Sequence, residues 1–81
     1  MSRKRQNYKH EVVEATSIPL RDGGFTVNFN LEQSTGSYRD VTYFESGQHF
    51  ETEEAALEAG IKLGQHKIDA GYTTDAPVVN G

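Results

Sequence analysis

The sequence predicts an α+β domain of two layers, in which a three-stranded antiparallel meander carries one C-terminal amphipathic helix on one face, in the order β-β-β-α. Two observations lead to this fold class. Residues 25–31 alternate apolar and polar side chains, as a strand with one buried face does. Residues 52–71 place apolar side chains at helical spacing, between a threonine that can cap a helix and a glycine that can end one. With 81 residues, the chain has room for one such domain.

The first two strands are expected before and after a tight turn. Residues 8–18 are rich in β-branched and aromatic side chains, and Pro19 then limits further pairing because it lacks an N–H group. The Asp22-Gly23 pair supplies the positive φ that a hairpin turn requires. Residues 25–33 follow as the second strand.

The third strand is expected over residues 38–45. Neither of its faces is cleanly polar, so the face of the sheet away from the helix is expected to show Phe44 or Tyr43, depending on register. A small sheet that is covered on one side only is a common reason for a domain to dimerise. The candidate interface residues on this open face are Tyr38, Thr42 and Phe44.

The helix is expected to begin after Thr52, with two glutamates in its first turn opposing the positive end of the helix dipole, and to end at Gly71. Its interior holds Gly60 and Gly64, and each glycine destabilises a helix by roughly 1 kcal/mol relative to alanine. Their spacing puts both on the buried face, where they let the helix backbone approach a neighbouring element closely. That neighbour is the sheet or, as the alternative, a second helix in a dimer.

The two ends of the chain are expected to lie outside the packed domain, which spans residues 8–71. Residues 1–7 form a basic segment without apolar periodicity and are expected to be disordered, and residues 72–81 form a flexible C-terminal tail. The formal net charge is −4, but the first nine residues carry +4 and the remainder carries −8. An acidic body disfavours nucleic-acid binding, because nucleic-acid-binding domains present a basic face.

The basic N-terminal arm and the strand aromatics keep nucleic-acid binding as an alternative hypothesis. In that hypothesis cationic side chains contact the phosphates, and bases stack on Tyr38 or Tyr43. The cationic residues proposed for this contact are Arg3, Lys4, Arg5, Lys9 and Arg39.

No pattern in the sequence indicates catalysis or a cofactor. The chain has no cysteine, its three histidines are dispersed without ligand spacing, and its loop serines lack the nucleophile pattern of a hydrolase. We therefore expect no metal, no cofactor, no small-molecule substrate and no enzymatic activity. No apolar run is long enough to span a membrane and no hydrophobic segment follows the basic N-terminus, so a cytoplasmic protein is expected.

Residues 50–55 (FETEEA), followed by Gly60 and by Lys67-Ile68-Asp69, resemble the C-terminal part of small bacterial single-domain proteins. These include the proteins grouped near the HlyU-type hemolysin regulators, which have a strand hairpin, a helix start of this kind and an Ile-Asp ending. The resemblance covers residues 50–69. It implies a β-β-β-α domain from mostly uncharacterised families, with a role accessory to regulation, and it brings no catalytic residues.

Two functions follow as hypotheses. The first is a small bacterial interaction domain without catalytic activity, which self-associates through the open face of its sheet as a homodimer or binds another protein there. The second is an accessory or regulatory nucleic-acid-binding protein. The mass in solution separates them, since a dimer favours the first hypothesis and a monomer directs the search to another protein or to a nucleic acid.

Overall fold

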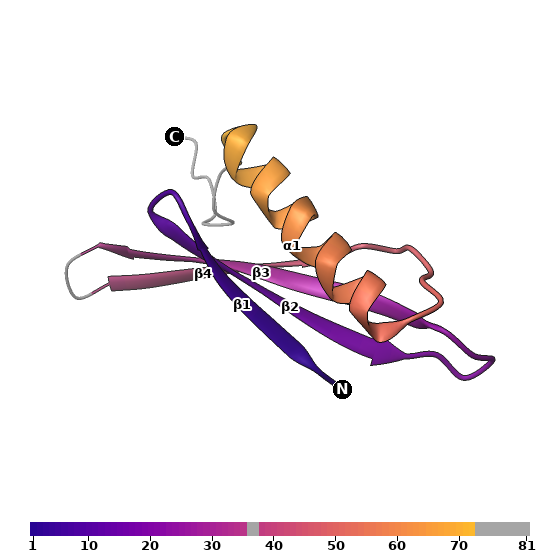
Figure 1. The fold of residues 1–81 in the computed structure, drawn as a ribbon. Helices are drawn as coiled ribbons and strands as arrows, with labels where there is room; N and C mark the ends of the chain where they lie inside the picture. The colour runs from indigo at the N-terminus through magenta and orange to yellow at the C-terminus, as the bar shows by residue number, and fades with distance from the viewer. Residues whose placement is uncertain (36–37, 73–81) are drawn as a thin grey trace, which may run out of the picture.

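The computed structural model describes residues 1–35 and 38–72, and it shows a sheet that is covered on one face by a helix (Figure 1). The elements are β1 (Arg3–Tyr8), β2 (Glu11–Pro19), β3 (Phe25–Thr35), β4 (Tyr38–Glu45) and α1 (Glu53–Asp69). All strand pairs are antiparallel and the sheet order is β1-β2-β3-β4, so each strand pairs with the next one along the chain. The α+β class, the meander and the C-terminal helix packed on one face are confirmed.

The expected number of strands is wrong. The sheet has four strands, because residues 3–8 form β1 in place of a disordered tail. β1 lacks an apolar face and is held by pairing with β2 over its whole length, across a turn in which Lys9 has a positive φ of 57°. The packed domain therefore begins before residue 8. Of the expected flexible C-terminal tail, residues 73–81 lie outside the described residues.

A buried serine of β2 ties the start of the chain to the helix. Ser17 is fully buried, and its hydroxyl donates a hydrogen bond to the Glu53 carboxylate at 3.1 Å. The same hydroxyl oxygen accepts a hydrogen bond from the Ser2 N–H at 3.1 Å, and the Ser17 N–H donates to the Ser2 carbonyl at 2.9 Å. The buried Ser17 side chain on β2 therefore connects Ser2, which precedes β1, to Glu53 in the first turn of α1.

The core lies between α1 and the face of the sheet that points toward it, which we call the inner face. β3 turns Val27, Phe29 and Leu31 inward, as the alternation of the sequence predicts. β2 contributes Val13 and Ala15 from the same face. The buried apolar residues are Val13, Ala15, Val27, Phe29, Leu31, Ala56 and Ile61.

The predicted helix ends are confirmed. The Thr52 side-chain oxygen accepts a hydrogen bond from the Ala55 N–H at 3.1 Å, which satisfies one of the free donors of the first turn. Two glutamates occupy that turn, and α1 ends at Asp69. Gly71 follows with a φ of 76°, a left-handed conformation that glycine adopts without strain.

α1 packs closely on the sheet because two of its glycines face the strands. A Cβ atom built on Gly60 would come within 2.8 Å of Ala15 Cβ and of Val27 Cγ2. A Cβ atom on Gly64 would overlap Val13 Cγ1 still more closely. Real Cβ atoms essentially never come within 3.0 Å of another atom, so alanine fits at neither position unless something shifts. The prediction that the glycines serve close packing of the helix on the sheet is confirmed.

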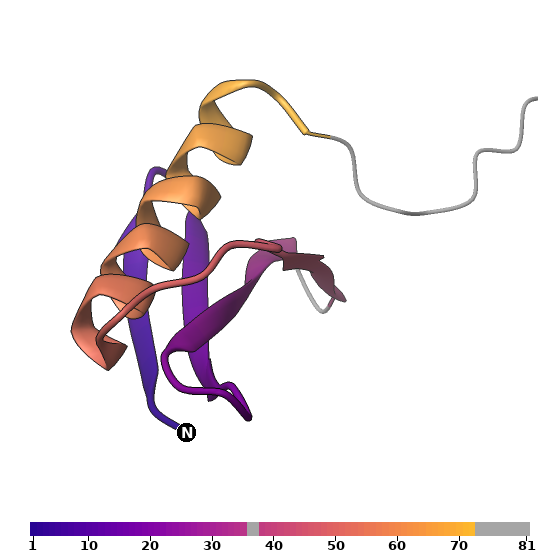
Figure 2. The same ribbon diagram turned by 90° about the vertical axis from the view of Figure 1, so that its right-hand side faces the viewer.

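The helix does not extend over the whole sheet. Within the described residues, α1 packs on β2 and β3 and touches β1, but its backbone does not reach β4 (Figure 1). The same arrangement is visible from the side, where β4 lies away from the helix (Figure 2). β4 is therefore an edge strand whose backbone no helix of the described chain covers.

The register of β4 corrects the candidate interface. Phe44 lies opposite Phe29 and stacks on it, with the ring centroids 5.1 Å apart, so it belongs to the inner side of the sheet. Thr42 and Tyr38 share that side because side chains alternate along a strand, and Tyr38 is 72% exposed there. The expectation that these three residues lie on the open face is therefore wrong. Tyr43 lies on the open face instead.

Replacing Gly64 with alanine is expected to lower the free energy of unfolding by about 1 kcal/mol. Overpacking against Val13 costs about 1–3 kcal/mol, and the better helix propensity of alanine returns roughly 1 kcal/mol of that. Urea unfolding measures the difference. The control is Lys62→Ala on the exposed side of α1, which is expected to change stability by less than about 0.5 kcal/mol. A Gly64→Ala variant more stable than the wild type would show that the helix can move away from β2 without loss.

Candidate interaction surface

The face of the sheet that points away from α1, the outer face, carries polar side chains from all four strands. Its composition follows from alternation, because every second residue of β2 and β3 is buried inward and the residues between them point outward. Directly opposite residues of antiparallel strands share a face. The outer face is formed by Arg3, Arg5, Asn7, Val12, Glu14, Thr16, Ile18, Thr26, Asn28, Asn30, Glu32, Ser34, Arg39, Val41, Tyr43 and Glu45.

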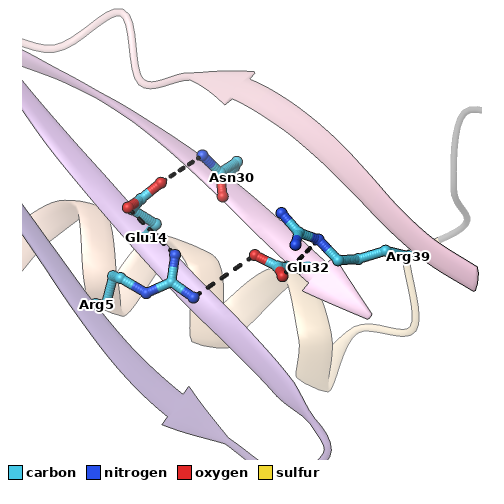
Figure 3. Close-up of polar contacts among 5 residues, drawn as sticks. All are labelled: Arg5, Glu14, Asn30, Glu32 and Arg39. Carbon is cyan, nitrogen blue, oxygen red and sulfur yellow. Dashed lines mark hydrogen bonds and ion pairs between the residues drawn. The ribbon is translucent and has the colours of Figure 1, made fainter. Parts of the chain in front are cut away.

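A chain of ion pairs and hydrogen bonds crosses the outer face from β1 to β4 (Figure 3). Arg5 on β1 lies 3.3 Å from the Glu14 carboxylate on β2 and 3.7 Å from the Glu32 carboxylate on β3. The other oxygen of Glu32 lies 2.9 Å from Nε of Arg39 on β4. The Asn30 side-chain amide donates to Glu14 at 3.3 Å. Two carboxylates thus neutralise two guanidinium groups and join the four strands.

The surroundings of Glu14 favour its charged form. The hydrogen bond from Asn30 lowers the pKa of the Glu14 carboxyl, and the hydrogen bond and charge of Arg5 lower it further, against the opposing effect of burial. A carboxyl group with a lowered pKa has no proton to donate at neutral pH. Glu14 is therefore suited to be a fixed acceptor and not a general acid.

Beside this network the outer face forms a hollow of about 610 Å³. Tyr43 stands at this hollow with 75% of its surface exposed, and Arg3 and Glu45 bring opposite charges to it. Among the described residues that line it there is no histidine, and the hollow offers hydrogen-bonding amides, an aromatic ring and charges of both signs. These groups can bind and orient a partner. The lining residues are Arg3, Glu14, Thr16, Asn28, Phe29, Asn30, Tyr43, Phe44 and Glu45.

The five basic residues that were predicted to contact nucleic acid do not lie together in the structure. Lys4 points to the inner side, where it lines a smaller hollow of about 230 Å³ together with residues of α1. Lys9 lies in the turn between β1 and β2, and its Nζ pairs with Asp69 at 2.6 Å. The residues that do meet on the outer face are Arg3, Arg5 and Arg39. Two of these three are already paired with carboxylates, so the proposed set does not form a basic patch.

A second polar cluster fastens the end of α1 to the sheet. The Asp69 carboxylate accepts hydrogen bonds from Lys9 Nζ at 2.6 Å and from the Tyr8 hydroxyl at 2.9 Å. These bonds lower the pKa of the Asp69 carboxyl and raise the pKa of both donors. Tyr72 binds Glu11 in a similar way, and burial followed by that hydrogen bond raises the pKa of Tyr72. These contacts hold the last turn of the helix against the turn between β1 and β2.

The free edge of β4 presents a regular set of backbone groups. The Ser46 N–H donates to the Val27 carbonyl at 3.1 Å, and the register between β3 and β4 is continuous. In an antiparallel ladder every second residue directs both backbone groups to the same neighbour. The even-numbered residues of β4 therefore bond to β3. The residues whose N–H and C=O groups point outward from the sheet are Arg39, Val41, Tyr43 and Glu45.

The acceptors of the network, Glu14 and Glu32, were not proposed from the sequence. Their signal is the polar half of the alternation, because a strand that buries Leu31 must expose Glu32 on the other face. By the same alternation, the buried Val13 predicts that Glu14 lies on the outer face. The ion pairs of these two glutamates with Arg5 could not be predicted, because the sequence of β1 has no pattern that indicates a strand.

Comparisons with protein-family models, with curated proteins and with solved structures found no match. The resemblance of residues 50–69 to small bacterial proteins near the HlyU-type regulators therefore stays a prediction. Within residues 1–35 and 38–72, no three His, Cys, Asp or Glu side chains are grouped to hold a metal ion. In the same part of the chain, no helix is long and apolar enough to cross a membrane.

The outer network is expected to make stability depend on pH through Glu14. Its usual pKa of 4.5 is lowered in the folded protein, so the folded state binds this proton less tightly than the unfolded state does. The stability that Glu14 contributes is present above about pH 4.5 and is lost as the pH falls through the lowered pKa. Unfolding free energies measured between pH 6 and pH 3 should therefore fall less steeply for Glu14→Gln than for the wild type. The control is Glu51→Gln, an exposed residue before the helix, and equal slopes for the wild type and Glu14→Gln would contradict this role.

Proposed function

We propose that this domain is a non-enzymatic interaction module that self-associates as a homodimer along the β4 side of its sheet. The observation that carries the proposal is the outer edge of β4, which pairs with no other strand among the described residues and which the backbone of α1 does not reach. Its outward N–H and C=O groups recur at every second residue from Arg39 to Glu45. An edge strand with a continuous row of such groups is a template for a further strand.

The other edge of the sheet is less suited to self-association. β1 carries Arg3, Lys4 and Arg5 in succession, so a second copy of β1 would bring like charges together. β4 mixes one basic and two acidic side chains, and it carries Val41 and Tyr43, which favour strand pairing. Charge therefore protects β1 and leaves β4 as the edge available to another chain.

The outer face beside β4 supports binding better than catalysis. Its central carboxylates are held as acceptors by arginine and asparagine side chains. A nucleophilic mechanism needs a nucleophile within hydrogen-bonding reach of a base. Thr16 and Tyr43 bring hydroxyl groups to the hollow, and among the described residues neither hydroxyl forms a hydrogen bond with Glu14.

Light scattering across a concentration series is expected to show a dimer for the wild type and a monomer for Val41→Pro. Val41 directs its N–H away from β3, so proline removes a donor from the free edge without removing a hydrogen bond inside the chain. The matched control is Asn7→Pro, which makes the same change on the free edge of β1 and is expected to stay dimeric. Circular dichroism checks that both variants are folded. A wild type that is monomeric at every concentration would end the proposal.

Nucleic-acid binding stays a second candidate because Arg3, Arg5 and Arg39 share the outer face with Tyr43. Single-stranded bases stack on exposed aromatic rings of surfaces that also carry cationic side chains. The ion pairs with Glu14 and Glu32 count against it, since they neutralise two of the three cations before any phosphate arrives.

A fluorescent single-stranded oligonucleotide titrated at low salt tests this second candidate. If the outer face binds it, Tyr43→Ala is expected to weaken binding by about 1–3 kcal/mol, and affinity should fall steeply as salt is added. The control is Lys62→Ala on α1, away from the outer face. Truncating residues 1–9 is not a useful variant, because it would remove β1. No binding at low salt, or equal binding by the wild type and Tyr43→Ala, would reject the candidate.

A further inference from the structure

We propose that two copies of this chain join by antiparallel pairing of β4 with β4, in the register that sets Thr42 opposite Thr42 of the second copy. Arg39 of each copy then lies opposite Glu45 of the other. This inference rests on the proposed self-association, and it adds the identity of the partner strand, the register and the side chains that select it.

The backbone restricts which registers are available. Only the odd-numbered residues of β4 have outward N–H and C=O groups, so they must pair with odd-numbered residues of the second copy. The numbers of two opposing residues then add up to an even number. The two-fold axis therefore passes between the two copies of one residue, which lie directly opposite each other. Directly opposite residues share a face, so the two α1 helices lie on the same side of one continuous sheet.

Among these registers, the one centred on Thr42 uses the whole edge. It pairs Arg39 with Glu45 and Val41 with Tyr43, so every outward-facing residue of β4 finds a partner. A register centred on Val41 leaves Glu45 of both copies beyond the end of the partner strand. A register centred on Tyr43 leaves Arg39 of both copies beyond the end of the partner strand. The backbone hydrogen bonds therefore favour the Thr42 register.

The side chains favour the same register. Arg39 and Glu45 are opposite charges on the outer face, and the two-fold axis forms the pair twice. Glu45 forms no ion pair with the other described residues, so its carboxylate is available to a second copy. Arg39 is held by Glu32 through Nε at 2.9 Å, and the rest of its guanidinium can donate to a further carboxylate. Val41 opposite Tyr43 adds a β-branched and aromatic cross-strand pair.

The register is tested by cysteine cross-linking, which the sequence permits because the chain has no cysteine of its own. In the proposed register the Cα atoms of the two Thr42 residues lie about 4.5 Å apart, a separation that a disulfide can span. Thr42→Cys is therefore expected to give a covalent dimer under mild oxidation. Val41→Cys is expected to cross-link poorly, and Asn7→Cys on the β1 edge serves as the control for random collision.

The outcomes separate the register from the proposed function. A dimer by light scattering that cross-links through Thr42→Cys supports both. A dimer that cross-links through Val41→Cys, or through neither variant, overturns this register while self-association stands. A monomeric wild type without any covalent dimer overturns both.

The charge pair is tested by reversal. Glu45→Arg puts two arginines opposite each other at both ends of the pairing, and the dimer dissociation constant is expected to rise on the order of tenfold. The combined Arg39→Glu and Glu45→Arg variant restores opposite charges and is expected to recover most of that loss. Weakening by Glu45→Arg without recovery in the combined variant, with both proteins folded by circular dichroism, would count against the Arg39–Glu45 contact.

Discussion

The close contact between α1 and the middle of the sheet determines the rest of this structure. Gly60 and Gly64 let the helix backbone lie against Ala15, Val27 and Val13, in space that side chains would otherwise fill. A helix is about 10 Å wide and strands are about 4.8 Å apart, so the backbone of α1 lies over β2 and β3, and its Lys67 side chain extends over the Phe44 ring of β4. The glycines thus fix α1 against β2 and β3, and the backbone edge of β4 lies beyond the reach of the helix backbone.

The outer face has a different role from the core. Ion pairs between exposed groups contribute about 0–1 kcal/mol each. In the Arg5–Glu14 and Arg39–Glu32 contacts the arginine side chains are exposed and the glutamates are mostly covered, so these contacts contribute modestly to stability. They do help to specify register. A slip of one residue between two strands would move each charged partner to the inner face, against the helix. The polar network therefore selects one arrangement of the strands, and the apolar inner face stabilises it.

The parts of the fold that could be predicted are those with a strong local pattern. The alternation from Phe25 to Leu31 identified β3 and its inner face, and Thr52 and Gly71 identified the ends of the helix. The spacing of Gly60 and Gly64 also indicated close packing before any contact was known.

The missed parts depend on pairing between distant segments. β1 reads RKRQNY, with no apolar period, and it becomes a strand because β2 offers it a free edge and Ser17 holds its approach. β4 carries mixed side chains on both faces, so only its register against β3 decides which side Phe44 occupies. The candidate surface was misplaced for the same reason, because a shift of one residue exchanges the two faces of a strand.

The buried hydroxyl of Ser17 joins the approach to the first strand of this domain to the first turn of its helix, which is synthesised later than all four strands. Ser2 leaves the ribosome long before Glu53, yet both bind the same oxygen atom. Protein synthesis adds roughly 5–20 residues per second, so the helix is completed a few seconds after the strands whose apolar side it covers. During translation, Val13, Phe29 and Leu31 are therefore exposed together with the open edges of the strands. Before the helix docks, the chain is therefore more prone to aggregate than the finished domain, because apolar surface and strand edges are exposed together.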